Sequence, residues 1–257
     1  MTRSYERIKV ERAGRVETIT LSNPARRNAI GPQMASELLW ALEDARAAVD
    51  VRSIVLTGEG KSFCAGGDFS GAASESELPH KGDFADLLLA LYRSEKPIVA
   101  RVNGDALGGG LGLAAACTFA VASSNARLGT PEIDVGLFPM MIMAVLRRRI
   151  PRRRLTEMML FGERLDAEEA ARIGLVNRAV DAGQLDAAVK AITDAIASKS
   201  ASTVRLGLRA LAAQDDLDLE QALPMLRDRL AEVLATDDAR EGLMAFLEKR
   251  PPKWTGK

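Results

Sequence analysis

The stretch NGDALGGGLG (103–112) closes the β-like run KPIVARVNG (96–104) and leads into the helix-like LGLAAAC (111–117). Its glycines let the backbone approach a ligand closely and adopt dihedral angles that other residues avoid. The free N–H groups at the start of the helix would point at whatever occupies the loop. A tight strand-to-helix turn has the same pattern, and this stretch alone favours that plain interpretation.

A second glycine-rich segment, KSFCAGGD (61–68), follows the β-like run RSIVLTG (52–58). Two backbone N–H donors that converge on one oxygen form an oxyanion hole, which contributes strongly to catalysis where negative charge develops. The two segments, each placed after a strand, are therefore candidates for the two halves of such a site.

Strand-like and helical patterns alternate along the first part of the chain. The helical pattern is clearest at 32–50, where Pro32 suits a first helical turn, and at 84–95. This alternation predicts an α/β core over 1–183, and the helical spacing that follows predicts a helical segment over 184–257. The strand-like runs lie at 16–21, 52–58, 96–104, 117–123 and 175–180.

Composition narrows the classes of function. Thirty-five basic residues balance 35 acidic ones, so no nucleic-acid or membrane partner is expected. We interpret the one local basic cluster, RRR at 147–149 and again at 152–154, as a solvated helix end. Cys64 and Cys117 are too few for a disulfide framework, and the N-terminus lacks a signal-peptide pattern, so we expect a cytoplasmic protein.

His80 is the single histidine, and it lies in a polar, loop-like stretch. A Ser/His/Asp triad or a histidine-based zinc site would have to be built on it. We therefore expect neither, and no metal site.

A dinucleotide-binding fingerprint is the main alternative for the glycine-rich segment at 103–112. GLGLAA (110–115) matches its GxGxxA form, and Glu132 lies about where a ribose-binding acid would stand. In that fold the first glycine follows its strand at once, whereas here GDALG (104–108) intervenes. We therefore disfavour a nucleotide-dependent dehydrogenase.

The two glycine-rich segments belong to a longer series of motifs. FCAGGD (63–68) matches a Phe-x-Ala-Gly-x-Asp pattern, NGDALGGG (103–110) matches Asn-Gly-x-Ala-x-Gly-Gly-Gly, and Pro131-Glu132 follows downstream. In order and spacing the series resembles the crotonase superfamily, the enoyl-CoA hydratase/isomerase family, over nearly the whole chain. Its other members here are NPARRNAI (23–30), GLVNRAV (174–180) and DDAREGLMAFLEKRPPKW (237–254).

This resemblance implies an α/β fold with a crotonase-like core of repeated ββα units and a helical C-terminal trimerisation segment at 184–257. It implies a homotrimer or a dimer of trimers. The substrate would be an acyl-CoA thioester, so that coenzyme A is part of the substrate and no separate cofactor is expected.

The resemblance also assigns roles by position in the motifs. It makes the N–H groups of Gly67 and Gly109 the oxyanion donors and Glu132 the catalytic carboxylate. The adenine of coenzyme A would lie against the backbone around 65–68. The cations considered for its phosphates are Arg26, Arg27, Lys249 and Lys253. The residues expected at the substrate are Ala65, Gly66, Asp68, Gly108, Gly112, Met140 and Arg26.

One position departs from the hydratase pattern. Hydratases of this family have two glutamates, and Gly112 replaces the one that would accompany Glu132. Water addition shares its proton transfers naturally between two carboxylates, whereas moving a double bond from the 3,4 to the 2,3 position needs one. We predict enoyl-CoA isomerisation first, hydration second and a non-catalytic acyl-CoA-binding protein third. A water molecule held in a space beside Gly112 could stand in for the missing acid.

MMIM (140–143) replaces the glycines that hydratases have at this point. Methionines suit an apolar, adaptable acyl pocket, and they equally suit a helix packed into the core. Aryl-CoA dehalogenases share the glycine at 112, but their nucleophilic aspartate corresponds to Met140, so dehalogenation is disfavoured. Decarboxylation or C–C hydrolysis of a CoA thioester stays open.

Overall fold

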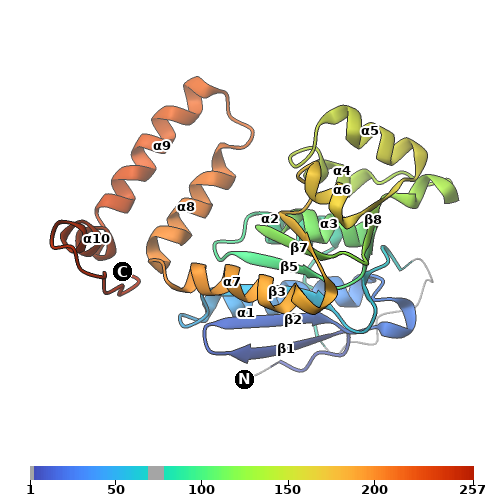
Figure 1. Ribbon diagram of the computed structural model, residues 1–257, viewed down its shortest axis with the longest axis horizontal. Helices are drawn as coiled ribbons and strands as arrows, with labels where there is room; N and C mark the ends of the chain where they lie inside the picture. Colours follow the sequence, from blue (N-terminus) through green and yellow to red (C-terminus); the bar gives the residue numbers. More distant parts are fainter. Residues whose placement is uncertain (1–2, 69–77) are drawn as a thin grey trace.

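A computed structural model describes residues 3–68 and 78–257. Within them the strands form two sheets, one of order β1-β2-β3-β5-β7-β10 and one of order β4-β6-β8-β9 (Figure 1). In the larger sheet β1 and β2 are antiparallel, and every later pair is parallel. Its strands are β1 (Ile8–Ala13), β2 (Val16–Leu21), β3 (Ser53–Gly58), β5 (Ile98–Val102), β7 (Phe119–Ser123) and β10 (Arg178–Val180).

The smaller sheet is built from short strands that follow those of the larger one. Each of the strands β3, β5 and β7 is followed in the chain by a strand of the smaller sheet and then by a helix. This is the repeated ββα unit that the resemblance implied. The strands of the smaller sheet are β4 (Ser62–Cys64), β6 (Asp105–Leu107), β8 (Arg127–Gly129) and β9 (Arg164–Asp166).

Strand burial follows the residue pattern. In β2 buried and half-buried residues alternate along VETITL, as expected for a strand near the edge of a sheet. In β3 every residue of SIVLTG is buried, because helices cover both faces of the parallel region. The β-branched residues of β3 and β5 therefore meet apolar neighbours on both sides.

Local sequence signals set several helix starts. Pro32 stands in the first turn of α1 (Pro32–Ala47). Asp83 and Asp86 form a capping box at the start of α2 (Phe84–Tyr92). The other helices up to the last strand of the larger sheet are η1 (Pro24–Arg26), α3 (Gly109–Ala116), η2 (Pro131–Val135), α4 (Met140–Leu146), α5 (Arg152–Phe161) and α6 (Ala167–Arg172).

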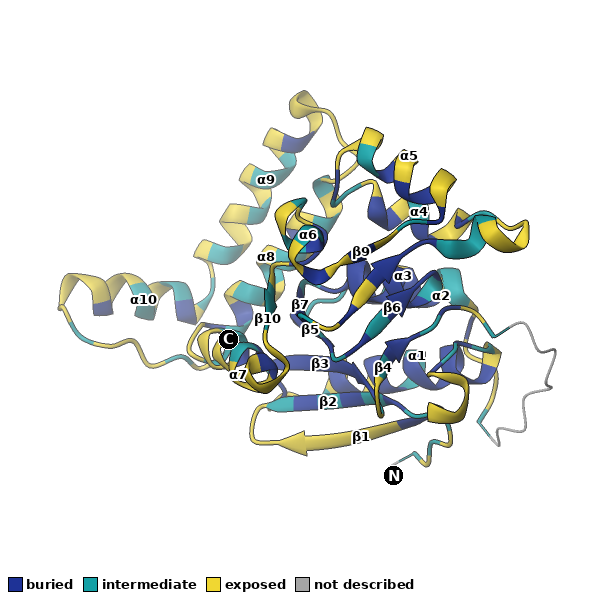
Figure 2. Cartoon of the chain, turned by 45° about the vertical axis from the view of Figure 1, so that its right-hand side comes forward, coloured by how far each residue is buried: buried dark blue, intermediate teal, exposed yellow. Residues whose placement is uncertain are grey.

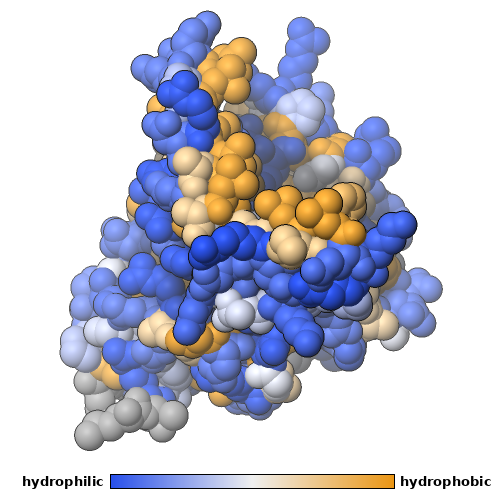
Figure 3. All heavy atoms as spheres, turned by 90° about the vertical axis from the view of Figure 1, so that its left-hand side faces the viewer, coloured by the Kyte–Doolittle hydropathy of each residue, from blue (hydrophilic) through white to orange (hydrophobic). Residues whose placement is uncertain are grey.

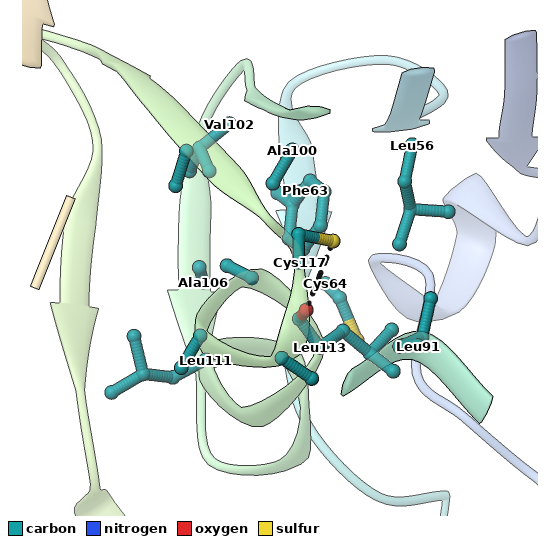
Figure 4. Close-up of a cluster of buried hydrophobic side chains, with 14 of the residues drawn as sticks. Leu56, Phe63, Cys64, Leu91, Ala100, Val102, Ala106, Leu111, Leu113 and Cys117 are labelled. Carbon is teal, nitrogen blue, oxygen red and sulfur yellow. Dashed lines mark hydrogen bonds between the residues drawn. The ribbon is translucent and has the colours of Figure 1, made fainter. Parts of the chain in front are cut away.

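The hydrophobic core is centred on α3, which contacts strands of both sheets. Phe63 from β4 and Leu111 and Leu113 from α3 are fully buried there. Figure 4 shows these side chains meeting those of β3, β5 and β6 around α3, with the Cys117 thiol donating to the carbonyl of Leu113. The core therefore holds α3 at a fixed place between the two sheets.

A second, smaller cluster lies between the larger sheet and α7 (Leu185–Ala197), which η3 (Ala182–Gln184) precedes. Val55, Val99 and Val121 pack there against Leu185 and Val189. Our sequence boundary put α7 with the C-terminal helical segment from residue 184. By its packing α7 lies with the core, so the helices that leave the core begin at α8.

The last three helices extend to one side of the core (Figure 1). They are α8 (Ala201–Gln214), α9 (Leu219–Leu234) and α10 (Asp237–Leu247). Figure 2 shows exposed residues over much of these helices, and Figure 3 shows apolar side chains gathered on this side of the molecule. The large apolar side chains that they expose are Leu211, Leu219, Leu223, Leu230, Leu234, Leu243, Met244, Phe246 and Leu247.

All five strand-like runs of the sequence contain strands, and both helical patterns of the first part of the chain are helices. The sequence patterns did not predict β1 or the strands of the smaller sheet. Three-residue strands are too short to show an alternation of apolar and polar residues. Across the described parts of the chain, no helix has the length and apolar content needed to cross a membrane.

Candidate active site

The smaller sheet brings the two glycine-rich segments together. Strands β4 and β6 pair in parallel, with Ser62 opposite Asp105 and Cys64 opposite Ala106. Both segments therefore leave the sheet at the same edge and in the same direction. A Cβ atom at Gly109 would lie 3.6 Å from the backbone nitrogen of Gly67. The two residues predicted as oxyanion donors are thus neighbours in space.

The N–H group of Gly67 faces away from its own strand partner. Gly67 forms a parallel bridge with Ile30, in which Ile30 N donates to Gly66 O and Asp68 N donates to Ile30 O, each at 2.8 Å. In a parallel ladder, the residue between two such bonds points its own N–H to the opposite side. That side is where Gly109 lies, so the N–H of Gly67 can donate to a group held beside Gly109.

Gly109 is the first residue of α3, where backbone N–H groups have no acceptor within the helix. The first intrahelical bond runs from Gly112 N to Gly108 O at 3.1 Å. The positive end of the helix dipole adds to the attraction of this N–H for negative charge. Gly109 therefore supplies a second donor next to that of Gly67.

An arginine of the basic cluster fixes the other end of α3. Arg149 donates from Nε to Ala115 O at 2.9 Å and from Nη2 to Cys117 O at 3.2 Å. These carbonyls belong to the last turn, where acceptors lack partners within the helix. We interpreted the cluster as a solvated helix end, and for Arg149 that was wrong, since the half-buried guanidinium braces the helix that carries Gly109.

Two glycines adopt backbone conformations that other residues rarely reach. Gly66 has φ of 110° and Gly108 has φ of 51°. A Cβ atom at Gly108 would lie 2.6 Å from Oε1 of Glu132. Position 108 favours glycine because of its conformation, and a side chain there would also have to displace the carboxylate of Glu132.

Glu132 lies in η2, immediately after β8 and Thr130. The hydroxyl of Thr130 is buried and donates to Met158 O at 2.8 Å, and Leu137 N donates to Glu132 O at 3.0 Å, which holds the turn in place. Oε2 of Glu132 is buried and has no hydrogen-bond partner among the described residues. A buried acceptor left without a donor is costly, and such groups are typical of catalytic sites.

Burial raises the pKa of the Glu132 carboxyl above its ordinary value, and a hydrogen bond from its own backbone N–H acts in the opposite direction. Desolvation disfavours the charged form of a carboxylic acid. A carboxylate of raised pKa is a stronger base than an exposed one, and its acid form can return the proton. Glu132 is therefore suited to move a proton in both directions.

An open cleft of about 660 Å³ lies over these groups. It contains the predicted donors and the predicted carboxylate, and it also borders Ile30, Phe84 and Arg164, which the sequence did not single out. Exposed apolar side chains, Val135 and Leu137, form part of its rim. The predicted residues in its wall are Ala65, Gly66, Gly67, Asp68, Gly108, Gly109, Glu132 and Met140.

Two residues predicted at the substrate are not in this wall. Arg26 is exposed and forms an ion pair with Asp68, with Nη1 and Oδ1 3.0 Å apart. Gly112 lies on the buried side of α3, and a Cβ there would lie 2.2 Å from Cγ2 of Ile142. The space that we expected beside Gly112 is therefore filled. The spacing of the motif gave no sign of this, because the filling side chain comes from another helix.

The methionines of MMIM are divided between the cleft and the core. Met140 and Met141 are exposed at the mouth of the cleft. Met143 points the other way and packs against the core. Since α4 begins at Met140, its first turn forms one wall of the cleft.

Comparison with known proteins agrees with this geometry. A family model described as enoyl-CoA hydratase/isomerase matches residues 11–257. A putative enoyl-CoA hydratase of Thermus thermophilus is 36% identical over 253 residues, covering 96% of this chain and 100% of that protein. A short-chain-enoyl-CoA hydratase of Clostridium acetobutylicum is 32% identical over 247 residues, covering 94% of each.

The fold agrees as well. The crystal structure of an enoyl-CoA hydratase from Mycobacterium smegmatis superposes with a TM-score of 0.90 at 33% identity, covering 97% of this chain and 99% of that one. The chain belongs to the enoyl-CoA hydratase/isomerase family. It is an acyl-CoA enzyme of the crotonase superfamily, as the motifs indicated.

Proposed function

We propose that this enzyme moves the double bond of an enoyl-CoA thioester from the 3,4 to the 2,3 position, with Glu132 as the only acid–base group. One observation carries the proposal. The buried, unpartnered Oε2 belongs to Glu132, which lies beside the paired glycine loops, while position 112 has no carboxylate. This is the arrangement that a single proton shuttle needs.

The proposed reaction conserves every atom of the substrate. Glu132 takes a proton from C2, and the electron pair spreads over C1 to C4 as a dienolate whose negative charge lies mainly on the thioester oxygen. The N–H groups of Gly67 and Gly109 donate to that oxygen as the charge develops. Glu132 then returns the proton to C4, which leaves the double bond between C2 and C3 and the carboxylate ready for another cycle.

The other acids of the cleft are placed less well for this role. Asp68 is paired with Arg26 at the edge of the cleft. Asp134 is exposed and lies against Gly162 at the end of α5. Within the described residues, Glu132 is thus the cleft carboxylate that burial activates.

Coenzyme A would be held as part of the substrate, with no separate cofactor. Its adenine would meet the backbone at 65–68, which forms part of the wall of the cleft. Arg26 would approach its phosphates from the edge of the cleft while keeping its pairing with Asp68. The compartment predicted from the sequence, the cytoplasm, stays a prediction.

Hydration of a 2-enoyl-CoA is the second candidate, because relatives at 32–36% identity are named enoyl-CoA hydratases. The third candidate is an acyl-CoA-binding protein without turnover. The lack of an acid at position 112 favours it, whereas the unpartnered carboxylate of Glu132 argues against it.

A panel of purified 2-enoyl- and 3-enoyl-CoA esters separates these three functions. Isomerisation leaves the mass unchanged and moves the vinyl signals in the NMR spectrum, whereas hydration adds the mass of one water. We expect fast isomerisation of 3-enoyl-CoA and slow hydration of 2-enoyl-CoA. Equal rates would contradict the proposal, and thermal stabilisation by acyl-CoA with no product would support the binding protein. NAD serves as the control ligand and should not stabilise the protein.

The helices α8 to α10 support a proposed trimer or dimer of trimers. Their exposed leucines form an apolar surface of the kind that marks an interface between subunits. Light scattering at micromolar concentration should give the mass of three or six chains. Leu223→Glu should shift that mass towards the single chain, and Glu220→Gln in the same helix should not. A single-chain mass for an active wild-type enzyme would contradict the proposed assembly.

A further inference from the structure

Gly108 is the N-cap of α3, and Gly112 lies in the first turn of that helix. Gly112 N donates to Gly108 O at 3.1 Å, so the two residues are one helical turn apart. Gly108 has φ of 51° and lies outside the helix, so a Cβ atom there and one at Gly112 point in different directions. A Cβ at Gly108 would meet the carboxylate of Glu132, whereas a Cβ at Gly112 would meet Ile142. Ile142 also lines the cleft that holds Glu132, so the space next to Gly112 adjoins that cleft.

That space is occupied by Ile142 of α4. A Cβ at Gly112 would lie 2.2 Å from Cγ2 and 2.9 Å from Cβ of Ile142, with Cδ2 of Leu88 at 3.6 Å. Ile142 is only 2% exposed, yet it reaches the wall of the cleft. A glycine at 112 is thus a requirement of packing, since even an alanine would overlap the isoleucine.

The side chains around this space are apolar. A buried water needs two to four polar partners, and neither Ile142 nor Leu88 has a polar atom in its side chain. The branched side chain of Ile142 therefore leaves no place for the water molecule that a second acid would hold and activate.

We infer that Ile142 is the residue that determines reaction specificity, because its Cγ2 methyl group takes the place of the second acid and keeps water from the α3 side of the proton shuttle. The inference rests on the proposed function. It extends that function by naming the group that suppresses hydration. It also couples Gly112 to Ile142, because the lack of a side chain at position 112 leaves the room that Ile142 occupies.

Substitution of Ile142 tests the inference. Ile142→Ala removes Cγ2 and opens room for water, whereas Ile142→Val keeps that methyl group. We expect the ratio of hydration to isomerisation to rise by on the order of tenfold in Ile142→Ala, below the ~10²–10⁴ that a positioned acid supplies. Ile142→Val should keep the wild-type ratio. Leu146→Ala, buried in α4 away from the cleft wall, controls for a general loosening of that helix.

Isomerisation in deuterium oxide gives a second readout of the same variants. A proton that Glu132 carries from C2 to C4 without contact with water leaves the C4 position largely unlabelled. We expect more deuterium at C4 of the product in Ile142→Ala than in the wild type or in Ile142→Val. A loss of stability alone would not change this labelling.

Double substitution tests the packing of the pair directly. Gly112→Ala should lower the melting temperature strongly in the wild-type background and much less in Ile142→Ala, because the methyl group that it overlaps is then absent. Gly112→Glu with Ile142→Ala should hydrate 2-enoyl-CoA faster than Ile142→Ala does. Gly112→Glu alone should not, because no room exists for the glutamate.

The outcomes distinguish the two claims. If the wild type isomerises but Ile142→Ala changes neither the hydration ratio nor the deuterium content, the role of Ile142 is wrong and the proposed function stands. If the wild type does not isomerise any 3-enoyl-CoA, the proposed function itself fails. A hydration ratio that rises equally in Leu146→Ala would also overturn the inference.

Discussion

Helices α3 and α9 are both rich in leucine and alanine, yet α3 is buried and α9 is largely exposed. In α3 every residue from Gly110 to Ala116 is buried, between two sheets and other helices. In α9, which the structure describes in full, Ala222 is the one buried residue, and Leu219 and Leu223 are 66% and 57% exposed. The apolar side chains of α3 are covered by the rest of the chain, whereas most of those of α9 are not.

This difference separates chemistry from assembly. The groups of the proposed reaction all lie at 65–142, around α3, in the part that packs against itself. The leucines of α9 stay in contact with water in the single chain, which is why we propose that another subunit covers them. Substitutions around α3 should therefore change turnover without changing the mass in solution, and substitutions in the C-terminal helices should do the reverse.

The largest effect should come from Glu132→Gln, which keeps the shape of the side chain and removes the base. We expect turnover to fall by ~10²–10⁴, the range for a positioned acid–base group. Acyl-CoA binding and the mass in solution should stay as in the wild type. Asp134→Asn should retain most of its activity. If Glu132→Gln keeps near wild-type rates, another group carries the proton. The assignment of the reaction to the region around α3 would then be wrong.

Gly109→Val should have the next largest effect. The new side chain would crowd Phe84, whose Cζ lies 3.3 Å from the Cβ position, and would stand beside Gly67 N at 3.6 Å. Loss of one oxyanion donor costs ~10²–10³ in turnover. Circular dichroism should show an intact fold. The matched control is Gly207→Ala in α8, where a Cβ would meet no atom of the described chain within 4 Å.

Asp238→Ala should affect the C-terminal helices and not the region around α3. Asp238 is buried at the start of α10, and its carboxylate accepts hydrogen bonds from Ser200, Ser202, Thr255 and Gly256. Burial alone would raise the pKa of Asp238, but these hydrogen bonds outweigh it and hold the pKa below its usual value. The carboxylate therefore ties the end of the chain to the start of α8.

Without that carboxylate, the buried donors lose their acceptor, at a cost of about 1–3 kcal/mol. We expect a lower melting temperature and a smaller mass by light scattering, while the turnover of the protein that remains assembled stays close to normal. Asp238→Asn should be milder, since the amide oxygen still accepts. Full loss of activity with unchanged mass would show that the two regions are not separate.

The smallest expected effect is a change of stability with pH. The pKa of Glu132 is raised in the folded protein, so the folded state holds its proton to higher pH than the unfolded state does. Stability should therefore fall as pH rises through the window between the ordinary and the raised pKa. Glu132→Gln should melt above the wild type at neutral pH, and the gap should shrink in acid. Turnover should show the opposite trend, because catalysis needs the carboxylate. A gap that grows in acid would contradict the direction of the shift.

Much of the site was accessible from the sequence because its signals are local. A glycine run after a strand and before a helix indicates free N–H groups, and this applies to Gly109. For Gly67 the direction of the N–H depends on the bridge to Ile30, which the sequence did not show. Glu132 was assigned by the family resemblance, as the glutamate of the Pro131-Glu132 motif. Arg26 was assigned to the phosphates from the family resemblance, which gave no sign of its pairing with Asp68.

The sequence by itself determined the family, the two glycine loops and the single glutamate, because each rests on residue types at fixed spacings along the chain. Only the tertiary structure decided that Ile142 fills the space at Gly112, that Arg149 braces the end of α3 and that α7 packs with the core. These are contacts between residues far apart in the chain. They depend on which side-chain volumes and unpaired carbonyl groups come together when the helices pack. The periodicity of a local segment does not show which distant side chain will contact it.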